Sequence, residues 1–182
     1  MRKLLVVIPL VLLLCFSFGC QKGEKVAEEA MVVLEGFKAQ AEVEEQNKAL
    51  ILKWYEDLDK ANIDACIEMF SPDFLWYAPS NSPNPMSKKK SQEYMIEGSK
   101  AFPKMIHKIE EIMTAGDKVI ARTIDYLTHE GEYLGIPATG KKIEFSVIAI
   151  FHVKDGKIVE IREEVDLLGA FQQIGMELKP KE

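Results

Sequence analysis

The stretch that decides the fold is KKIEFSVIAIFHVKDGKIVEIREEVD, residues 141–166. It contains two runs rich in β-branched residues, Lys141–Val153 and Lys157–Asp166, on either side of Asp155-Gly156. An Asp-Gly pair between two such runs is a strong signal for a tight hairpin, because both turn positions take a positive φ. The stretch therefore predicts two antiparallel strands joined by a two-residue turn.

Further strands are predicted upstream of this hairpin. Met105–Thr114 and Lys118–His129 are long and rich in Val, Ile and Thr, which favour strands. Asp73–Tyr77 is a shorter candidate, and the segment Ala78–Ser87, with three prolines and two asparagines, predicts a loop. The second half of the chain is therefore expected to be mostly sheet.

Helices are predicted before the sheet and once after it. The four expected helices are Val43–Lys60, Asn62–Phe70 with Pro72 as its stop, Ser87–Ala101 with Ser87 as its cap, and Leu167–Ile174. Helices followed by an antiparallel sheet predict an α+β domain over residues 43–178. We expect the early helices to cover one face of a curved sheet and to leave a pocket between the two layers.

The first 19 residues have the features of a secretory signal peptide. Arg2 and Lys3 are followed by the apolar run Leu4–Phe16 and then by small residues. A run of this length is too short for the roughly 20 residues that span a bilayer, although an uncleaved membrane anchor remains the alternative. The chain is therefore expected to be exported.

Cys20 directly follows Gly19, an arrangement that resembles the lipobox of bacterial lipoproteins. The resemblance implies acylation of Cys20 and anchoring to the extracytoplasmic face of a bacterial cell membrane or outer membrane. Residues 20–42 carry Val26, Ala30, Val33 and Phe37 at helical spacing, which predicts a helical spacer between the anchor and the domain.

Charge and cysteine content narrow the function classes. Without Arg2 and Lys3, 21 basic residues face 29 acidic ones, a net charge of −8. This acidic balance disfavours a nucleic acid as partner, because phosphate contacts need clustered Lys and Arg. Cys66 would be the only thiol left besides Cys20, so no disulfide is expected within the mature chain.

Four motifs make the chain similar to a known family. They are Asn47-Lys48 through Trp54-Tyr55-Glu56, then Phe70-Ser71-Pro72-Asp73-Phe74, then the run THEGEYLGIPATG at 128–140, and DGKIVE at 155–160 continuing through Asp166, Leu168, Gln172, Gln173 and Gly175. Together they resemble the SnoaL-like polyketide cyclases, or ester cyclases, of the nuclear-transport-factor-two-like superfamily. The third motif is the most specific of the four.

The resemblance implies a cone-shaped curved sheet closed by helices, and it leaves a homodimer open because members are often dimeric. It also implies acid–base closure of a ring without metal or cofactor. The family's acid–base aspartate lies where the last strand meets the last helix, and Asp166 is the matching position. Strict alternation in the last strand would place Arg162, Glu164 and Asp166 on one face.

Two roles are open for Asp166 from the residues alone. As a general acid–base it would be tuned by Glu164 and Arg162, since a neighbouring carboxylate raises its pKa and a guanidinium lowers it. As the residue before a helix, it would instead cap the free backbone amides. Either role, or both, fits the sequence.

The other candidate site residues also have two interpretations. His129, at the end of a strand, could donate a hydrogen bond to a substrate carbonyl, or it could be a turn residue satisfied by backbone. The predicted pocket aromatics could line a site for a small apolar ligand or belong to the core; they are Trp54, Tyr55, Trp76, Tyr77 and Tyr126. Three histidines without local ligand spacing argue against a metal site.

Two functions therefore compete. One is a cofactor-independent cyclase or isomerase that moves a proton on a small apolar carbonyl compound. The other is a lipoprotein without catalytic activity, which captures a small molecule or binds a partner protein.

Overall fold

The computed structural model describes residues 7–177, 179 and 180, and it describes side chains from residue 26 onward. The chain divides into two compact units, Met1–Glu42 and Val43–Glu182. Each unit is described by itself. Residues 1–6 of the expected signal peptide lie outside the described residues.

Helix α1 spans Val7–Asp59, so the expected spacer and the first helix of the domain form one continuous helix. From residue 26 to residue 42 its apolar positions, including Val26, Val33 and Phe37, are exposed. In the part of the chain that the structure describes, no helix combines the length and apolar character needed to cross a membrane.

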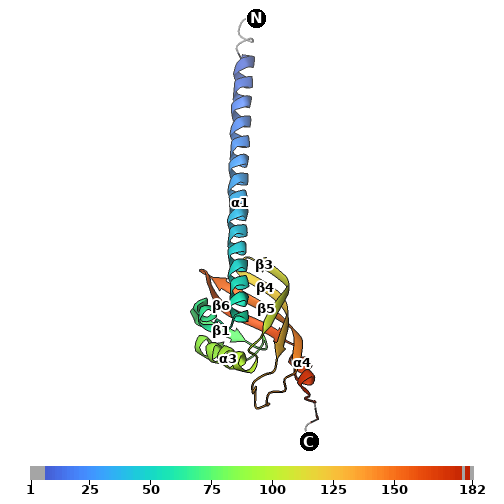
Figure 1. Cartoon of the computed structure of the whole chain (residues 1–182). Coiled ribbons are helices and arrows are strands. Elements are labelled where there is room, and N and C mark those ends of the chain that lie inside the picture. Colours follow the sequence, from blue (N-terminus) through green and yellow to red (C-terminus); the bar gives the residue numbers. More distant parts are fainter. Residues whose placement is uncertain (1–6, 178, 181–182) are drawn as a thin grey trace. The chain divides into compact units, whose positions relative to one another are not determined.

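The second unit contains a six-stranded curved sheet of order β2-β1-β6-β5-β4-β3 (Figure 1). The strands are β1 Phe70–Tyr77, β2 Met86–Ser87, β3 Ile106–Ala115, β4 Lys118–Thr128, β5 Lys142–Lys154 and β6 Lys157–Val165. The helices are α2 Ile63–Glu68, α3 Lys88–Ala101 and α4 Leu167–Ile174, besides the end of α1. The predicted α+β class is therefore confirmed.

The predicted hairpin is confirmed in detail. Asp155 and Gly156 have φ of 52° and 70°, the two positive values that this turn requires, and Lys154 pairs with Lys157 across it. Ser87 caps α3 by accepting a hydrogen bond from the backbone N–H of Lys90. Local turn and cap signals thus determine these boundaries.

Two expectations about the start of the sheet are wrong. Pro72 does not stop the second helix, which ends at Glu68; it lies inside β1. The sheet is also not wholly antiparallel, because β1 pairs with β6 in parallel. The chain passes through α3 and four further strands between β1 and β6, and that long connection permits a parallel pair.

One aromatic core lies between the sheet and the helices. Phe151 of β5 is fully buried and packs edge-on against Trp54 and Tyr55 of α1, with ring centroids 5.5 and 5.8 Å apart. Phe70 and Phe74 of β1 stack at 3.7 Å. Cys66 of α2 is buried beside them, and burial raises the pKa of its thiol to about 12, so this cysteine is inert as a nucleophile.

Candidate active site

The face of the sheet that packs on the helices carries polar groups among apolar ones. In β4, every second residue from Val119 to Leu127 is buried, and the residues between them are more exposed. Two of these buried positions hold Thr123 and Asp125. Buried polar groups are costly unless they have partners or a function, so this part of the inner face is a candidate site.

Glu163 of β6 belongs to the same inner face. It pairs with Ala149 of β5, which pairs in turn with Ala121 of β4, and both alanines are buried. Small side chains beside Glu163 leave room for its carboxyl group on the inner face, where Glu163 is half-buried. Burial raises the pKa of Glu163 to about 8, and the nearby charges of Asp125 and Glu164 act in the same direction.

Trp76 of β1 is the aromatic neighbour of this carboxyl group. Its indole partly offsets the raised pKa of Glu163, although Nε1 makes no hydrogen bond of ordinary geometry to any described residue. Tyr94 of α3 packs edge-on against Trp76 at 5.9 Å, lies within electrostatic reach of Glu163, and is 40% exposed.

A second polar group on the inner face connects β4, β3 and α1. The Thr123 hydroxyl donates to Asp125 Oδ1 at 2.6 Å, and Asp125 Oδ2 lies 3.8 Å from Nε2 of His107. On the other side of the ring, His107 Nδ1 lies 2.6 Å from Asp59 Oδ1. Burial raises the pKa of Asp125, while His107 and Thr123 partly oppose that change.

The structure separates the predicted pocket aromatics into two sets. Trp54, Tyr55 and Trp76 lie on the inner side and are at most 5% exposed. Burial, assisted by the charges of Asp125 and Glu163, raises the pKa of Tyr55. These three residues belong to the core, as the second interpretation expected, and a role in lining a ligand site stays a prediction.

The remaining aromatics were placed wrongly by the sequence. Tyr126 alternates with the buried Asp125 and Leu127 and is 39% exposed on the outer face. Tyr77 lies under the guanidinium of Arg162, whose Cζ is 3.9 Å from the ring centroid. Strand alternation excludes both from the inner face, because their neighbours Trp76 and Asp125 point inward.

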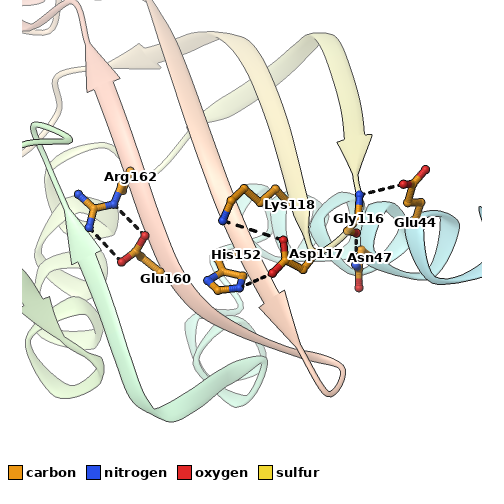
Figure 2. Close-up of polar contacts among 8 residues, drawn as sticks. All are labelled: Glu44, Asn47, Gly116, Asp117, Lys118, His152, Glu160 and Arg162. Atoms are coloured by element: carbon orange, nitrogen blue, oxygen red, sulfur yellow. Dashed lines mark hydrogen bonds and ion pairs between the residues drawn. The ribbon is translucent and has the colours of Figure 1, made fainter. Parts of the chain in front are cut away.

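Arg162 and Glu164 also lie on the outer face, so their assignment to the pocket is wrong. Arg162 binds Glu160 through two nitrogens, at 2.8 and 3.1 Å (Figure 2), and donates to the Ser80 carbonyl at 2.8 Å. Glu164 accepts from the Ser80 hydroxyl. The prediction that Arg162 and Glu164 share a face is confirmed, but that face is directed away from the core.

Asp166 has the capping role of the two that the sequence left open. It is exposed, it is the N-cap of α4, and its Oδ1 accepts a hydrogen bond from the Gly169 N–H at 2.9 Å. The prediction that Asp166 is the inward acid–base is therefore replaced: Glu163, three residues earlier, is the inward carboxyl group.

Capping by Asp166 predicts a specific pattern of stability. Asp166→Ala should lower the free energy of unfolding by about 1 kcal/mol, because the first amides of α4 lose their acceptor, whereas Asp166→Asn should retain most of it. Denaturant unfolding of both variants measures the difference. Equal losses in the two variants would contradict the capping role.

His129 is fully buried at the end of β4. Its ring packs on Phe102 at 5.4 Å, and Nδ1 lies 3.2 Å from Thr139 Oγ1. Its backbone N–H and carbonyl bond to Lys141 and Gly140, as expected for a turn residue satisfied by backbone. Nε2 is buried and has no hydrogen-bond partner among the described residues.

Two open hollows lie elsewhere on the second unit. One, of about 600 Å³, is lined by residues that include Asn47, Leu50 and Val153, and another, of about 390 Å³, includes Ser71 and Val159. Neither is lined by Glu163, Asp125, His129 or Asp166. These two hollows therefore do not reach the polar groups of the inner face.

The sequence interpretation missed Glu163, Asp125 and His107. An available signal was the polar pair Thr123 and Asp125 at buried positions of a strand whose other inward residues are apolar. Glu163 carried a weaker signal, since it follows Ile161 by two residues and Ile161 is almost fully buried.

Comparison with known proteins agrees with the family resemblance that the sequence motifs indicated. The family model described as SnoaL-like polyketide cyclase matches residues 49–174. The aklanonic acid methyl ester cyclases DnrD of Streptomyces peucetius and DauD of Streptomyces sp. (strain C5) are each 36% identical over 77 residues. Those residues cover 41% of this chain and 52% and 47% of the two cyclases, so the chain spans about half the length of these curated relatives.

Solved structures share the fold. AclR of Streptomyces galilaeus, a proposed hydroxylase, has a TM-score of 0.67 at 26% identity over 72% of this chain and 97% of its own. IdmH of Streptomyces antibioticus, a proposed polyketide cyclase, has a TM-score of 0.63 at 24% identity over 72% and 99%. With the family model covering more than half of its length, the chain belongs to the SnoaL-like polyketide cyclase family.

Proposed function

We propose that this chain is a cofactor-independent acid–base enzyme of the cyclase or isomerase type, acting on a small apolar carbonyl compound. The observation that carries the proposal is the place of the Glu163 carboxyl group on the inner face, beside the buried Ala149, where its pKa is raised to about 8. A general base works best when its pKa lies near the operating pH, because it is then basic enough and still sufficiently ionised. Family membership and the named activity of the two matched cyclases support the same reaction class.

The proposed reaction uses two side chains of this protein, those of Glu163 and Trp76. Ionised Glu163 takes a proton from the carbon next to a carbonyl, which leaves an enolate. The Trp76 N–H, unpartnered among the described residues, supplies a hydrogen bond to the developing negative oxygen. In a cyclase the enolate carbon then bonds to a second carbonyl carbon of the same molecule, and Glu163 returns its proton to the new alkoxide.

Proton exchange at a model ketone tests this function. In D₂O, the protein should replace the α-protons of 2-tetralone with deuterium faster than buffer does, as followed by proton NMR. After subtraction of the buffer rate, exchange should rise with pH and level off above about 8, because the carboxylate of Glu163 is the active form. Binding of the ketone without faster exchange would contradict an enzyme and support a binding protein.

We also propose that the domain is tethered to a bacterial membrane through Cys20. The support is the charged and apolar leader followed by Gly19-Cys20. Acyl chains would contribute about 0.8 kcal/mol per buried methylene to membrane binding. In a bacterial host, the full chain should fractionate with membranes and carry diacylglycerol on Cys20 by mass spectrometry, and Cys20→Ala should not. Equal membrane association of the variant would contradict the tether.

A further inference from the structure

The inner face contains a connected network of polar side chains that the proposed reaction does not use. It consists of Thr123 and Asp125 on β4, His107 on β3, and Asp59 at the end of α1. His107 and Asp125 are cross-strand partners, so the register of β3 and β4 places both on the same face. The side chains of His107 and Asp125 are 7% and 8% exposed, whereas that of Asp59 is 31% exposed. These four polar side chains therefore extend from the interior to the surface.

Asp59 determines which nitrogen of His107 carries the proton. Its Oδ1 accepts from the backbone N–H of His107 at 3.0 Å and also lies 2.6 Å from the ring Nδ1. A carboxylate oxygen can only accept hydrogen bonds, so the ring nitrogen next to it must be the donor. Nδ1 is therefore the protonated nitrogen. Nε2 is then left as an acceptor, and it faces Asp125 Oδ2 at 3.8 Å.

Asp125 is the carboxyl group that faces this nitrogen, across a gap slightly longer than a hydrogen bond. The Thr123 hydroxyl donates to its Oδ1, so its other oxygen, Oδ2, is the one that faces His107. Burial raises the pKa of Asp125, which favours the protonated form. The other titratable group packed on the ring is Tyr55 of α1, whose ring centroid is 5.5 Å from that of His107 and whose pKa is raised by burial.

We infer that Asp125, His107 and Asp59 form a proton path between the inner face and solvent. In this path the His107 ring holds the proton between the two carboxyl groups. Rotation of the Asp125 side chain first closes the 3.8 Å gap between its Oδ2 and Nε2 to hydrogen-bond distance. A proton then leaves Oδ2 and attaches to Nε2, while the proton on Nδ1 passes to Asp59 Oδ1. One proton enters the ring and one leaves it, and Asp59 then releases its proton to water. Reversal of these steps reprotonates Asp125.

The use of this path rests on the proposed function. Burial is the main cause of the raised pKa of Glu163, and the charge on Asp125 raises it further, so the protonation state of Asp125 affects how strongly Glu163 holds its own proton. Loss of the Asp125 proton through His107 would make Glu163 a stronger base. An enclosed acid–base site thereby gains a connection to bulk water that does not require the substrate to leave.

The test is the protonation of the His107 ring, read by long-range ¹H–¹⁵N NMR on the full chain with labelled histidine. In the wild type, the neutral ring should carry its proton on Nδ1. Asp59→Ala should shift the proton toward Nε2. The matched control is Asp117→Ala, since Asp117 Oδ2 lies 2.7 Å from Nε2 of His152 in a separate, exposed pair (Figure 2). That variant should change the protonation of the His152 ring and leave that of the His107 ring unchanged.

A neutral His107 with its proton on Nε2 in the wild type would overturn the path. So would a ring that keeps both protons from pH 5 to 9, or an unchanged ring in Asp59→Ala. The wild-type spectrum decides even if the Asp59 variant does not fold. The measurement needs no substrate, so a failed ketone-exchange assay would refute the proposed function and leave this test intact. If exchange is observed, Asp59→Asn should slow it at least several-fold and Asp117→Asn should not.

Discussion

Glu163→Gln is expected to lower the exchange of 2-tetralone α-protons by about 10²- to 10⁴-fold, the usual contribution of a positioned general base. Glutamine has nearly the same shape as glutamic acid but cannot accept a proton from carbon. Because Glu163 is protonated over much of the neutral range, with a pKa of about 8, its neutral replacement should fit the same enclosed space. The rate is measured by proton NMR in D₂O, and circular dichroism checks the fold.

The control for this variant is Asp166→Asn. Asp166 is exposed and caps α4, so its amide should keep both the helix and the exchange rate. Loss of exchange in Asp166→Asn with unchanged exchange in Glu163→Gln would return the acid–base role to Asp166 and contradict our assignment.

Phe151→Ala should cause one of the largest losses of stability, about 3–5 kcal/mol in the free energy of unfolding. Phe151 is 0% exposed and packs between the sheet and the aromatic rings of Trp54 and Tyr55. Its removal leaves a cavity that rigid neighbouring rings cannot fill. Denaturant unfolding followed by tryptophan fluorescence measures the loss.

The adjacent residue provides a matched control. Ile150 is on the outer face of the same strand and is 40% exposed, so Ile150→Ala should cost less than about 1 kcal/mol. Similar losses in the two variants would contradict the assignment of inner and outer faces in β5, and with it the placement of the site.

Local signals in the sequence predicted most of the architecture. The Asp155-Gly156 turn, the Ser87 cap and α4 each depend on residues close together in the chain, and all three are confirmed. The parallel pairing of β1 with β6 joins segments about 85 residues apart, such as Trp76 and Ile161. No local pattern specifies such a pairing, which depends on the tertiary fold.

The site was misplaced because β6 does not alternate strictly. Its register against β5 shifts between His152 and Val153, so Ile158 and Ile161 are both buried although they are three residues apart. A bulge of this kind reverses which residues face inward along the rest of the strand. Glu163 consequently faces inward, whereas Arg162 and Glu164 face outward.

The choice between the two roles of Asp166 also required the structure. An aspartate before a helix has the same sequence whether it caps the helix or points into a pocket. Only the hydrogen bond to Gly169 and the exposure of Asp166 distinguish the two. By contrast, Thr123 and Asp125 could have been recognised as inward polar groups from the alternation of β4 alone.

The proposed reaction requires the carboxyl group of Glu163 to exchange its proton near neutral pH. The most direct test is a pH titration of the glutamate side-chain ¹³C-carboxyl signals, with Glu163→Gln used to assign the signal of Glu163. We expect that signal to titrate near pH 8, well above the roughly 4.3 typical of an exposed glutamate. Titration of Glu163 near that typical value would show a solvated carboxyl group and would contradict the proposed catalytic role.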